Sequence, residues 1–351
     1  MRDVAVIAFA QAKSARRNTD CNEVEIVMPV VTEALEQSGI ERKEIGFTCS
    51  GSSDYLAGVA FSFVTSLDAI GAWPPIEESH VEMDGAWALV EAWVRLQHGD
   101  VDSALVYGFG KSSLGDISEI LSRQFDPYTV GPLWPDSISV AALQARALID
   151  TGRYSERDMA EVAARSRRDA KGNPYAQVAG DDDVEELLGR PYVASPLRKH
   201  DCPPISDGAA AIVLAAGDLA RAKCKRPAWI RGLDHRVDVQ NLGARDLTRA
   251  PSAKVAAEKA GAAKDKIDVA ELYAPFSHQE LILREEMGIG EGVRINPSGG
   301  ALSANPLMAA GLIRIGEAAR RIFDGEADRV LAHATSGPCL QQNLVCVMEG
   351  E

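Results

Sequence analysis

Uninterrupted apolar runs mark the interior strands of this chain. The first covers residues 4–10, and others cover residues 104–107 and 209–214. A strand that is buried on both faces loses the alternation of apolar and polar residues, so these runs predict strands inside a covered sheet. Two helices are expected near residues 137–150 and 156–170.

Two stretches, about 220 residues apart, repeat one order of elements. In each, a helix ends at a glycine, Gly39 or Gly261, and a short polar turn leads into an apolar strand. Glycine readily takes the left-handed backbone conformation that closes many helices, so both glycines are expected C-caps. The two strands are expected to end near Gly51 and Pro275.

The match continues further along both stretches. Gly99 and Gly325 again follow a helix and precede an apolar strand. The helices before them are expected to begin near Asp84 and Asn305. The two halves are therefore interpreted as duplicated β/α units, each of which presents a helix N-terminus to one shared site.

Residues 111–227 interrupt the repeat and divide the chain into three parts. Residues 1–110 form the N-terminal half, and residues 228–351 form the C-terminal half. The middle part is expected to hold an inserted loop domain and a strand that returns to the N-terminal half. A long insertion between repeats commonly carries binding residues, so we expect it to contribute to the site.

The net charge and the cysteines narrow the classes of function. The 351 residues carry a formal net charge of −14, which argues against a nucleic-acid partner because phosphate binding requires a positive surface. The six cysteines form no CxxC pair, which favours free thiols in a reducing cytoplasm. No run approaches the ~20 apolar residues of a membrane span. No spacing of His, Cys and Asp suggests a metal site in this chain.

Several segments together resemble the thiolase superfamily. They are the duplicated halves, the turn at residues 206–210 and the glycine-rich segment 299–306. The Phe-Asp-Pro-Tyr segment at residues 125–128 narrows the resemblance to the sterol-carrier-protein branch, the lipid-transfer proteins. The resemblance implies an α/β protein with the thiolase fold: a duplicated, five-layered α/β/α/β/α core with an inserted loop domain. It also implies a homodimer, or a heterodimer with a thiolase-like homologue.

The catalytic positions of thiolases hold different residues in this chain. Glu82 stands at the nucleophilic cysteine of the motif Cys-x-Ser/Thr-Gly, whose glycine is Gly85. Tyr273 replaces the Asn or His of a second motif, and Asn305 replaces the histidine of Gly-His-Pro. The position of the last thiolase cysteine falls within residues 334–337, which contain no cysteine, and Cys339 is near but not in register. Thiolysis requires a nucleophilic cysteine and its acid–base partners, so the resemblance predicts that the chain is not a true thiolase.

These departures are similar to those of bacterial steroid side-chain aldolases, which carry a tyrosine at the Tyr273 position and lack the nucleophilic cysteine. The similarity implies retro-aldol cleavage of a β-hydroxyacyl-CoA in steroid or sterol side-chain degradation. CoA would be part of the substrate, and no cofactor would be covalently bound. The similarity also implies a small acyl-CoA-binding partner protein with an OB-fold and a zinc ribbon. Those aldolases tend to carry a second tyrosine where this chain has Ser303.

Each candidate side chain has a structural alternative. Tyr273 can act as the base or a proton relay if its neighbours lower its pKa from ~10; otherwise it is a half-buried aromatic residue at a strand end. The helix expected near Asn305 offers N–H groups for an enolate, but Asn305 before a proline is also an ordinary N-cap. Glu82 is either a base or part of a salt bridge. Asp84 is expected to be an N-cap rather than a catalytic acid.

Two more residues are candidates for the catalytic end. Ser303 can donate a hydrogen bond to the site or simply allow close packing. His278 can face the site, although an exposed position on a helix is favoured.

Candidates for substrate binding lie in the middle part of the chain. Arg165, Arg167 and Arg168 form the best local anion site for a CoA phosphate, although a solvated helix face is the ordinary interpretation of such a cluster. Tyr128 and Trp134 can line an apolar pocket or merely anchor the loop domain.

Two other classes of function stay open beside the lyase. A non-catalytic subunit would use the fold to bind acyl-CoA or to scaffold an active homologue, which Ser303 and Asn305 favour. A divergent acyltransferase would use Cys339. The segment Gly108-Phe-Gly110-Lys-Ser looks like a phosphate-binding loop, but its first required glycine is missing.

Overall fold

Residues 2–351 are described by a computed structural model, in which ten strands form one mixed sheet in the order β10-β9-β11-β12-β8-β1-β7-β4-β2-β3. These strands are β1 (Val4–Gln11), β2 (Phe47–Gly51), β3 (Glu78–Val81), β4 (Ser103–Lys111), β7 (Asp207–Ala216), β8 (Ala228–Val237), β9 (Val269–Leu272), β10 (Arg294–Ile295), β11 (Arg329–Ser336) and β12 (Gln342–Glu349). The short strands β5 (Tyr192–Ala194) and β6 (Leu197–Arg198) pair separately. Only two residue pairs, Ala5 with Trp229 and Val6 with Ala228, join β1 to β8. The sheet therefore consists of two halves with a narrow junction.

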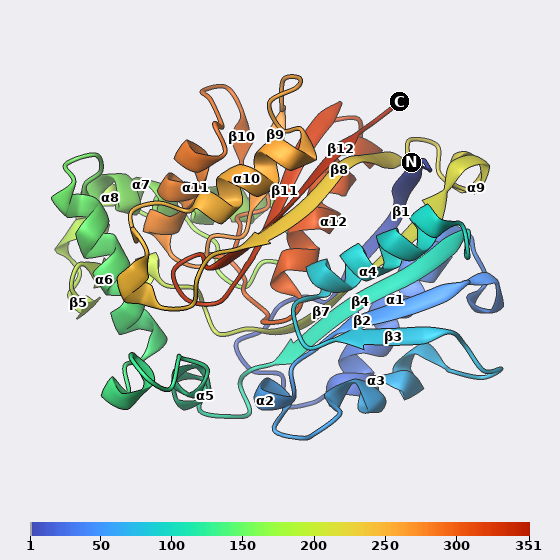
Figure 1. Cartoon of the computed structure of the whole chain (residues 1–351), viewed down its shortest axis with the longest axis horizontal. Coiled ribbons are helices and arrows are strands. Elements are labelled where there is room, and N and C mark those ends of the chain that lie inside the picture. Colours follow the sequence, from blue (N-terminus) through green and yellow to red (C-terminus); the bar gives the residue numbers. More distant parts are fainter. Residues whose placement is uncertain (1) are drawn as a thin grey trace.

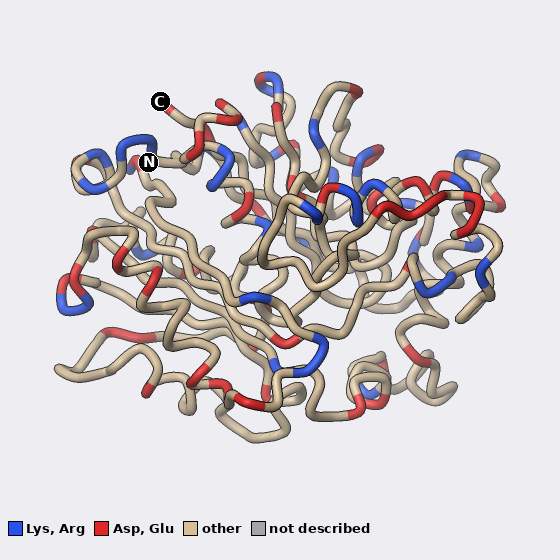
Figure 2. The backbone as a smooth tube through the Cα atoms, turned by 180° about the vertical axis from the view of Figure 1, so that it is seen from behind, with Lys and Arg blue, Asp and Glu red and all other residues tan. Residues whose placement is uncertain are grey.

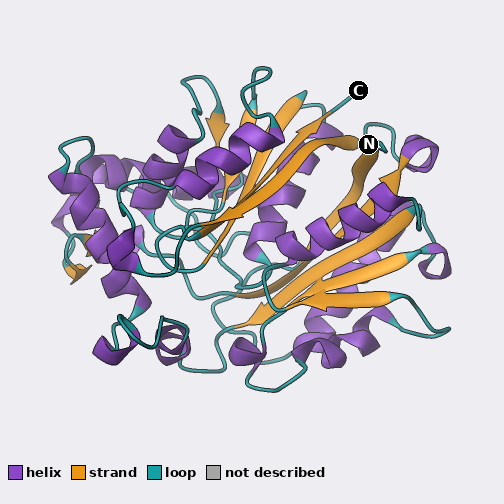
Figure 3. Cartoon of the chain, viewed as in Figure 1, coloured by secondary structure: helices purple, strands orange, loops and turns teal. Residues whose placement is uncertain are grey.

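Helices cover both halves of the sheet and also fill the space between them (Figure 3). They are α1 (Glu23–Ser38), α2 (Asp54–Ala57), α3 (Ser62–Ile70), α4 (Gly85–His98), α5 (Ile117–Arg123), α6 (Ser137–Asp150), α7 (Glu156–Asp169), α8 (Val184–Gly189), α9 (Gly217–Lys223), α10 (Pro251–Ala260), α11 (Ser277–Glu286) and α12 (Ala310–Phe323). One apolar core holds α4 and α12 between the two halves. A second core packs α1, α3 and α9 on the N-terminal strands, and a third packs α10 and α11 on the C-terminal strands. These cores confirm the expected α/β/α/β/α layering.

The repeat is confirmed by the strand pairing. Strand β2 lies parallel between β3 and β4, as β9 lies parallel between β10 and β11. The remaining neighbours are antiparallel. Parallel neighbours require a crossover, and the helix between β3 and β4 is α4, whereas the helix before β11 is α12. The two central helices are therefore equivalent elements of the two repeats.

The insertion folds around a small core of its own. Helices α6, α7 and α8 pack together there, and α11 and Leu302 of the C-terminal half complete that core. In Figure 1 these green helices lie at one end of the molecule beside α11. Figure 2 shows Lys and Arg interspersed with Asp and Glu over the outer helices and loops. No helix within residues 2–351 has both the length and the apolar character that a membrane crossing requires.

Candidate functional site

A cavity of about 660 Å³ lies where the two halves meet the insertion. Its apolar wall comes from α5, α6 and the segment before α6, and includes Ile117, Leu121, Phe125, Ile138 and Val140. Its polar lining includes Asp84, Ser112, Tyr273 and Asn305. These four polar residues lie at the ends of strands or before helices in both repeats. The fold therefore brings them together from distant parts of the sequence.

Glycines allow the backbone to approach closely at this cavity. A Cβ on Gly51 would lie 2.4 Å from the backbone nitrogen of Gly85, where α4 begins. A Cβ on Gly108 would lie 2.4 Å from the carbonyl oxygen of Met308. A Cβ on Gly110 would meet the Leu307 carbonyl even more closely. The glycines of the phosphate-loop-like segment therefore make room for the loop before α12, and a phosphate is not needed to explain them.

Three backbone hydrogen bonds hold the side chain of Asp84 in the cavity lining. Its Oδ1 accepts hydrogen bonds from the backbone N–H groups of Ala86 and Leu312, each at 2.9 Å. Its Oδ2 accepts a third hydrogen bond from Gly311, also at 2.9 Å. The expected N-cap on α4 is confirmed, and the same carboxylate also occupies the first turn of α12. Helix α12 has no side-chain cap of its own at Ala309.

The carboxyl group of Asp84 experiences opposing influences. Burial disfavours its charged form and raises its pKa, whereas the three backbone N–H groups and the Arg314 guanidinium lower it. Burial is the larger effect, so the pKa of Asp84 lies above the ordinary value of 3.8. The residue was expected to be structural, and its position in the cavity was missed. Its only sequence signal was the place two residues after Glu82, directly before the helix glycine.

Tyr273 follows β9 and lies almost fully buried in the cavity lining, with 4% of its surface exposed. Its backbone N–H donates to the carbonyl of His333 at 3.1 Å. Burial raises the pKa of its phenol well above the ordinary value, and the nearby Asp84 carboxylate raises it further. The requirement that neighbours lower this pKa is therefore not met. Tyr273 is a neutral hydrogen-bonding group rather than a base.

Asn305 lies in the cavity lining, but not at a helix N-terminus. Helix α12 begins at Ala310, so the expectation that Asn305 caps it is wrong. In the first turn of α12 the N–H groups of Gly311 and Leu312 donate to Asp84, so these two are not free to bind an enolate. The backbone N–H of Asn305 donates to Ser206 Oγ at 2.9 Å. Its buried side-chain Oδ1 has no hydrogen-bond partner among residues 2–351.

Ser112 was not identified from the sequence as part of a site. It follows β4 and is 4% exposed, and its Oγ has no hydrogen-bond partner within the described part of the chain. Buried polar atoms nearly always have partners, so unpaired groups in a cavity lining indicate a place for a polar ligand. The only available signal was its position at the end of an apolar strand.

Glu82 and Ser303 do not belong to the cavity lining. Glu82 is exposed, and its Oε1 accepts a hydrogen bond from the backbone N–H of Asp54 at 2.7 Å, at the start of α2. Ser303 is buried, and its Oγ donates to the Gly300 carbonyl at 2.8 Å. These contacts favour the structural alternative for each residue, and a catalytic role for either one stays a prediction.

His278 is neither exposed nor in the cavity lining. It lies fully buried on α11, with Nε2 3.1 Å from Oε1 of Gln144. Burial lowers the pKa of its imidazole to about 3, so the ring is neutral. Its neighbour Gln279 lines the cavity and donates to the same Gln144 oxygen at 3.0 Å. His278 therefore supports the cavity wall from behind.

The three arginines of the expected CoA-phosphate site lie on α7, away from the main cavity. Arg165 contacts both oxygens of Glu280 at 2.5 Å, and Arg167 pairs with Asp182 at 2.6 Å. Arg168 is largely exposed. Its guanidinium lies 3.6 Å from Asp169, so all three charges face carboxylates and the cluster offers much less positive charge than the sequence indicated.

The two aromatic candidates of the insertion point to solvent. Tyr128 is 88% exposed and Trp134 is 57% exposed, and neither lines the cavity. Phe125, three residues before Tyr128, lies in the cavity lining instead. The family-specific segment therefore reaches the site through a different aromatic residue.

The cysteines near the cavity are poor nucleophiles. Burial raises the pKa of Cys339 to about 12, and burial raises the pKa of Cys202 to the same region. A thiolate is the reactive form, so very little of either group would be reactive near neutral pH. The acyltransferase interpretation, which uses Cys339, is therefore disfavoured. Among residues 2–351, no three His, Cys, Asp or Glu side chains come together as a metal-binding group.

Comparisons with known proteins place these features in context. No protein-family model matches the chain. The chain is 27% identical over 373 residues to an acetyl-CoA acetyltransferase of Methanothermobacter thermautotrophicus, with 96% of this chain and 97% of the relative covered. It is 24% identical to bovine sterol carrier protein 2, with 83% of this chain and 61% of the relative covered.

Two further similarities concern lyases. The chain is 26% identical over 238 residues to a 17-hydroxy-3-oxo-4-pregnene-20-carboxyl-CoA lyase of Mycobacterium tuberculosis, with 64% of this chain and 61% of the relative covered. A solved structure described as an Ltp2-ChsH2(DUF35) aldolase superimposes with a TM-score of 0.81 at 19% identity, covering 99% of this chain and 98% of that chain. At that identity, the superposition shows a common fold.

Proposed function

Because this chain is a thiolase-like protein related to sterol carrier protein 2 and has the thiolase fold, we propose that it is a carbon–carbon lyase. In this proposal it cleaves a β-hydroxyacyl-CoA by a retro-aldol reaction, rather than transferring an acyl group. The observation that carries the proposal is the polar lining of the cavity. That lining contains a buried phenol and a buried carboxyl group, whereas Glu82, at the position of the thiolase nucleophile, lies outside it.

The polar groups suit the needs of a retro-aldol cleavage. Breaking the Cα–Cβ bond sends an electron pair onto the thioester as an enolate, which hydrogen-bond donors stabilise. The neutral phenol of Tyr273 and the side chains of Asn305 and Ser112 are available for this task at the cavity lining. No step in this reaction requires an acyl-enzyme intermediate, so the lack of a reactive thiol is no obstacle.

The apolar wall of the cavity favours a bulky apolar substrate. Residues of α5 and α6 such as Leu121 and Val140 supply this wall, and burying an apolar surface against it would contribute to binding. One relative is named for a pregnene carboxyl-CoA. A steroid-derived side chain esterified to CoA is therefore the substrate class in this proposal, with CoA supplied by the substrate itself.

The proposal also includes a partner and an oligomer. The similar solved structure is described as an aldolase with a DUF35 component. A small acyl-CoA-binding protein with an OB-fold and a zinc ribbon is the corresponding partner here. A homodimer, or a heterodimer with a thiolase-like homologue, remains part of the same proposal, as does a place in steroid side-chain degradation in the cytoplasm.

The test compares the wild-type protein with Tyr273→Phe, each with the candidate partner. Mass spectrometry would follow the conversion of a β-hydroxyacyl-CoA steroid to a ketone and a shortened acyl-CoA. We expect Tyr273→Phe to lower kcat by about 100-fold or more, as is typical when a positioned proton donor is lost. Tyr107→Phe is the matched control, because Tyr107 is equally buried but its hydroxyl contacts Ser66 away from the cavity.

The second candidate function is a binding or scaffolding subunit. It is favoured because Glu82, at the position of the thiolase nucleophile, and Ser303, at the position of the second aldolase tyrosine, both lie outside the cavity lining. Binding of the acyl-CoA without cleavage, by the wild type and by Tyr273→Phe alike, would support this second candidate and contradict the lyase.

A further inference from the structure

The bonding of Asp84 leaves one acceptor position open. A carboxylate has about four acceptor positions, and three backbone N–H groups occupy two on Oδ1 and one on Oδ2. A proton can therefore bind to Oδ2 without breaking any of the three hydrogen bonds. Because Asp84 lines the cavity, a ligand there can use the open position.

The surroundings of Asp84 act on its protonation in opposite directions. Two helix N-termini and three N–H donors stabilise the carboxylate. Nearly complete burial stabilises the neutral acid. A group that exchanges a proton during a reaction must exist in both forms near the working pH, and such opposing influences favour this behaviour.

Two independent observations indicate that a polar ligand belongs beside Asp84. Asn305 and Ser112 line the same cavity, and the buried Oδ1 of Asn305 and Oγ of Ser112 lack hydrogen-bond partners in the described chain. Leaving such groups unpaired costs stability. The hydroxyl and the thioester carbonyl of a β-hydroxyacyl group would supply the missing partners.

We infer that Asp84 is the acid–base residue of the cavity. This inference rests on the proposed retro-aldol function and names the group that moves the proton. The free position on the Asp84 carboxylate accepts the proton of the β-hydroxyl group. The hydroxyl oxygen becomes a carbonyl oxygen as the Cα–Cβ bond breaks, and the electron pair of that bond forms the thioester enolate.

The same proton completes the reaction. Protonated Asp84 donates it to the enolate carbon, which gives the shortened acyl-CoA and regenerates the carboxylate. One substrate becomes one carbonyl compound and one acyl-CoA, so the step needs no oxidant, reductant or water. Tyr273 remains protonated beside Asp84 and acts as a donor, which divides the base and donor roles between the two side chains.

The experiment replaces Asp84 in the complete protein with its partner present. We expect Asp84→Asn to lower kcat by about 100-fold or more while the affinity for substrate changes less than threefold. Glu82→Gln is the matched control, because it neutralises an exposed carboxylate two residues away, and it should retain full activity. Cleavage by Asp84→Asn at the wild-type rate would overturn the inference and leave the proposed lyase function intact.

Replacing Asp84 with the smaller alanine adds a second test, which distinguishes a catalytic role from a purely structural one. Asp84→Ala would vacate a space surrounded by three N–H donors, and such a space binds small anions. Added formate should restore part of kcat for Asp84→Ala, but not for Tyr273→Phe. Recovery of folding by formate without any recovery of kcat would show that Asp84 is structural alone.

A measurement on the wild type serves if these variants do not fold. The base must be ionised to accept a proton, so kcat/KM should fall as the pH drops through the pKa of Asp84. An activity that stays constant down to pH values well below the ordinary pKa of ~3.9 would contradict the inference. A wild-type protein that binds the substrate and never cleaves it would instead reject the proposed function itself.

Discussion

The two central helices, α4 and α12, occupy equivalent places in the two repeats but begin in different ways. Each has 14 residues. Helix α4 carries its own N-cap, Asp84, whereas the residue before α12 is Ala309 and supplies no cap. The equivalent N–H groups of Ala86 and Leu312 both donate to one oxygen, Oδ1 of Asp84. The first N–H groups of both helices need an acceptor, and Asp84 before α4 supplies it for both.

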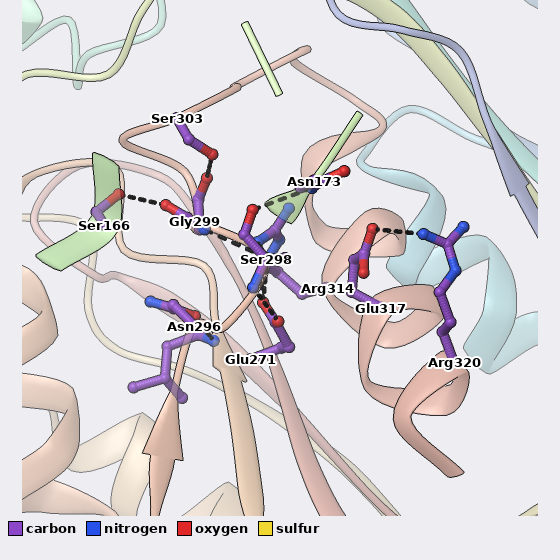
Figure 4. A network of polar contacts seen from close by, with 12 residues as sticks. Ser166, Asn173, Glu271, Asn296, Ser298, Gly299, Ser303, Arg314, Glu317 and Arg320 are labelled. Atoms are coloured by element: carbon purple, nitrogen blue, oxygen red, sulfur yellow. Dashed lines mark hydrogen bonds and ion pairs between the residues drawn. The ribbon is translucent and has the colours of Figure 1, made fainter. Parts of the chain in front are cut away.

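The interiors of the two halves differ as well. Cys49 of β2 and Glu271 of β9 occupy matching positions of the repeats, and both are fully buried. Glu271 accepts from Arg314 at 3.0 Å, and Ser298 Oγ donates to it at 2.7 Å (Figure 4). Burial raises the pKa of Glu271, and the Arg314 charge opposes that effect. The C-terminal half therefore depends on a buried ion pair where the N-terminal half has an apolar contact.

The largest expected effect concerns this ion pair. Arg314→Met should lower the free energy of unfolding by about 3–5 kcal/mol, because it leaves Glu271 buried without its charged partner. Urea denaturation of the two proteins would measure the difference. Arg95→Met is the control, since its partner Glu77 is half exposed and an exposed pair contributes about 0–1 kcal/mol. Equal losses for both variants would contradict the contrast between the halves.

The next effect concerns the shared cap. Asp84→Ala should lower the free energy of unfolding by about 2–4 kcal/mol, because it removes an N-cap and leaves buried N–H groups unpaired in two helices. Ser155→Ala, which removes the cap of the 14-residue helix α7, should cost only about 1 kcal/mol. Thermal and urea unfolding would compare them. A loss at Asp84 no greater than that at Ser155 would mean that α12 does not depend on this carboxylate.

A pH-dependent effect distinguishes the C-terminal half further. Burial lowers the pKa of His333 to about 4, whereas His80 and His98 of the N-terminal half are exposed. The unfolded chain binds the proton near pH 6.5 and the folded chain does not, so stability should fall as the pH drops from 6.5 towards 4. The slope should be about 1.4 kcal/mol per pH unit for this one group.

Urea denaturation between pH 7.5 and 4.5 would test this slope. His333→Gln should reduce the slope, whereas His235→Gln, which changes an exposed histidine on β8 of the same half-sheet, should leave it unchanged. If His333→Gln kept the wild-type slope, other groups would account for the acid sensitivity.

The smallest effect is expected at Glu82. Glu82→Ala removes an exposed acceptor of the Asp54 N–H, and water can take its place. The free energy of unfolding should change by less than about 0.5 kcal/mol. A loss comparable to that of Asp84→Ala would show that the former nucleophile position still matters for the fold.

Local signals in the sequence predicted much of the fold. Gly39, Gly99 and Gly261 were expected to close helices, and all three take the left-handed conformation at C-caps. The same glycines, together with the apolar runs, also predicted the repeat and the layers. These features depend on neighbouring residues and on apolar runs, which a sequence displays directly.

The site was harder to predict because its geometry depends on distant contacts. Asn305 and Pro306 look like the start of a helix, but the loop after them lies against Gly108 and Gly110, which are remote in sequence. Strand β3 ends at Val81, and this end point decides that Asp84 rather than Glu82 reaches the cavity. Tyr273 was a candidate base from the sequence and lines the cavity, but its burial raises its pKa, the opposite of the change that a base would need.

Duplication within a chain ordinarily lets each copy mutate without consequence for the other. The carboxylate of Asp84 removes that independence, because the start of the second copy's helix relies on a side chain encoded in the first. A serine or threonine at position 84 would offer one hydroxyl oxygen in place of the two carboxylate oxygens that accept from Gly311 and Leu312. A substitution in the first repeat therefore reaches the second repeat directly, through the two hydrogen bonds that Gly311 and Leu312 donate.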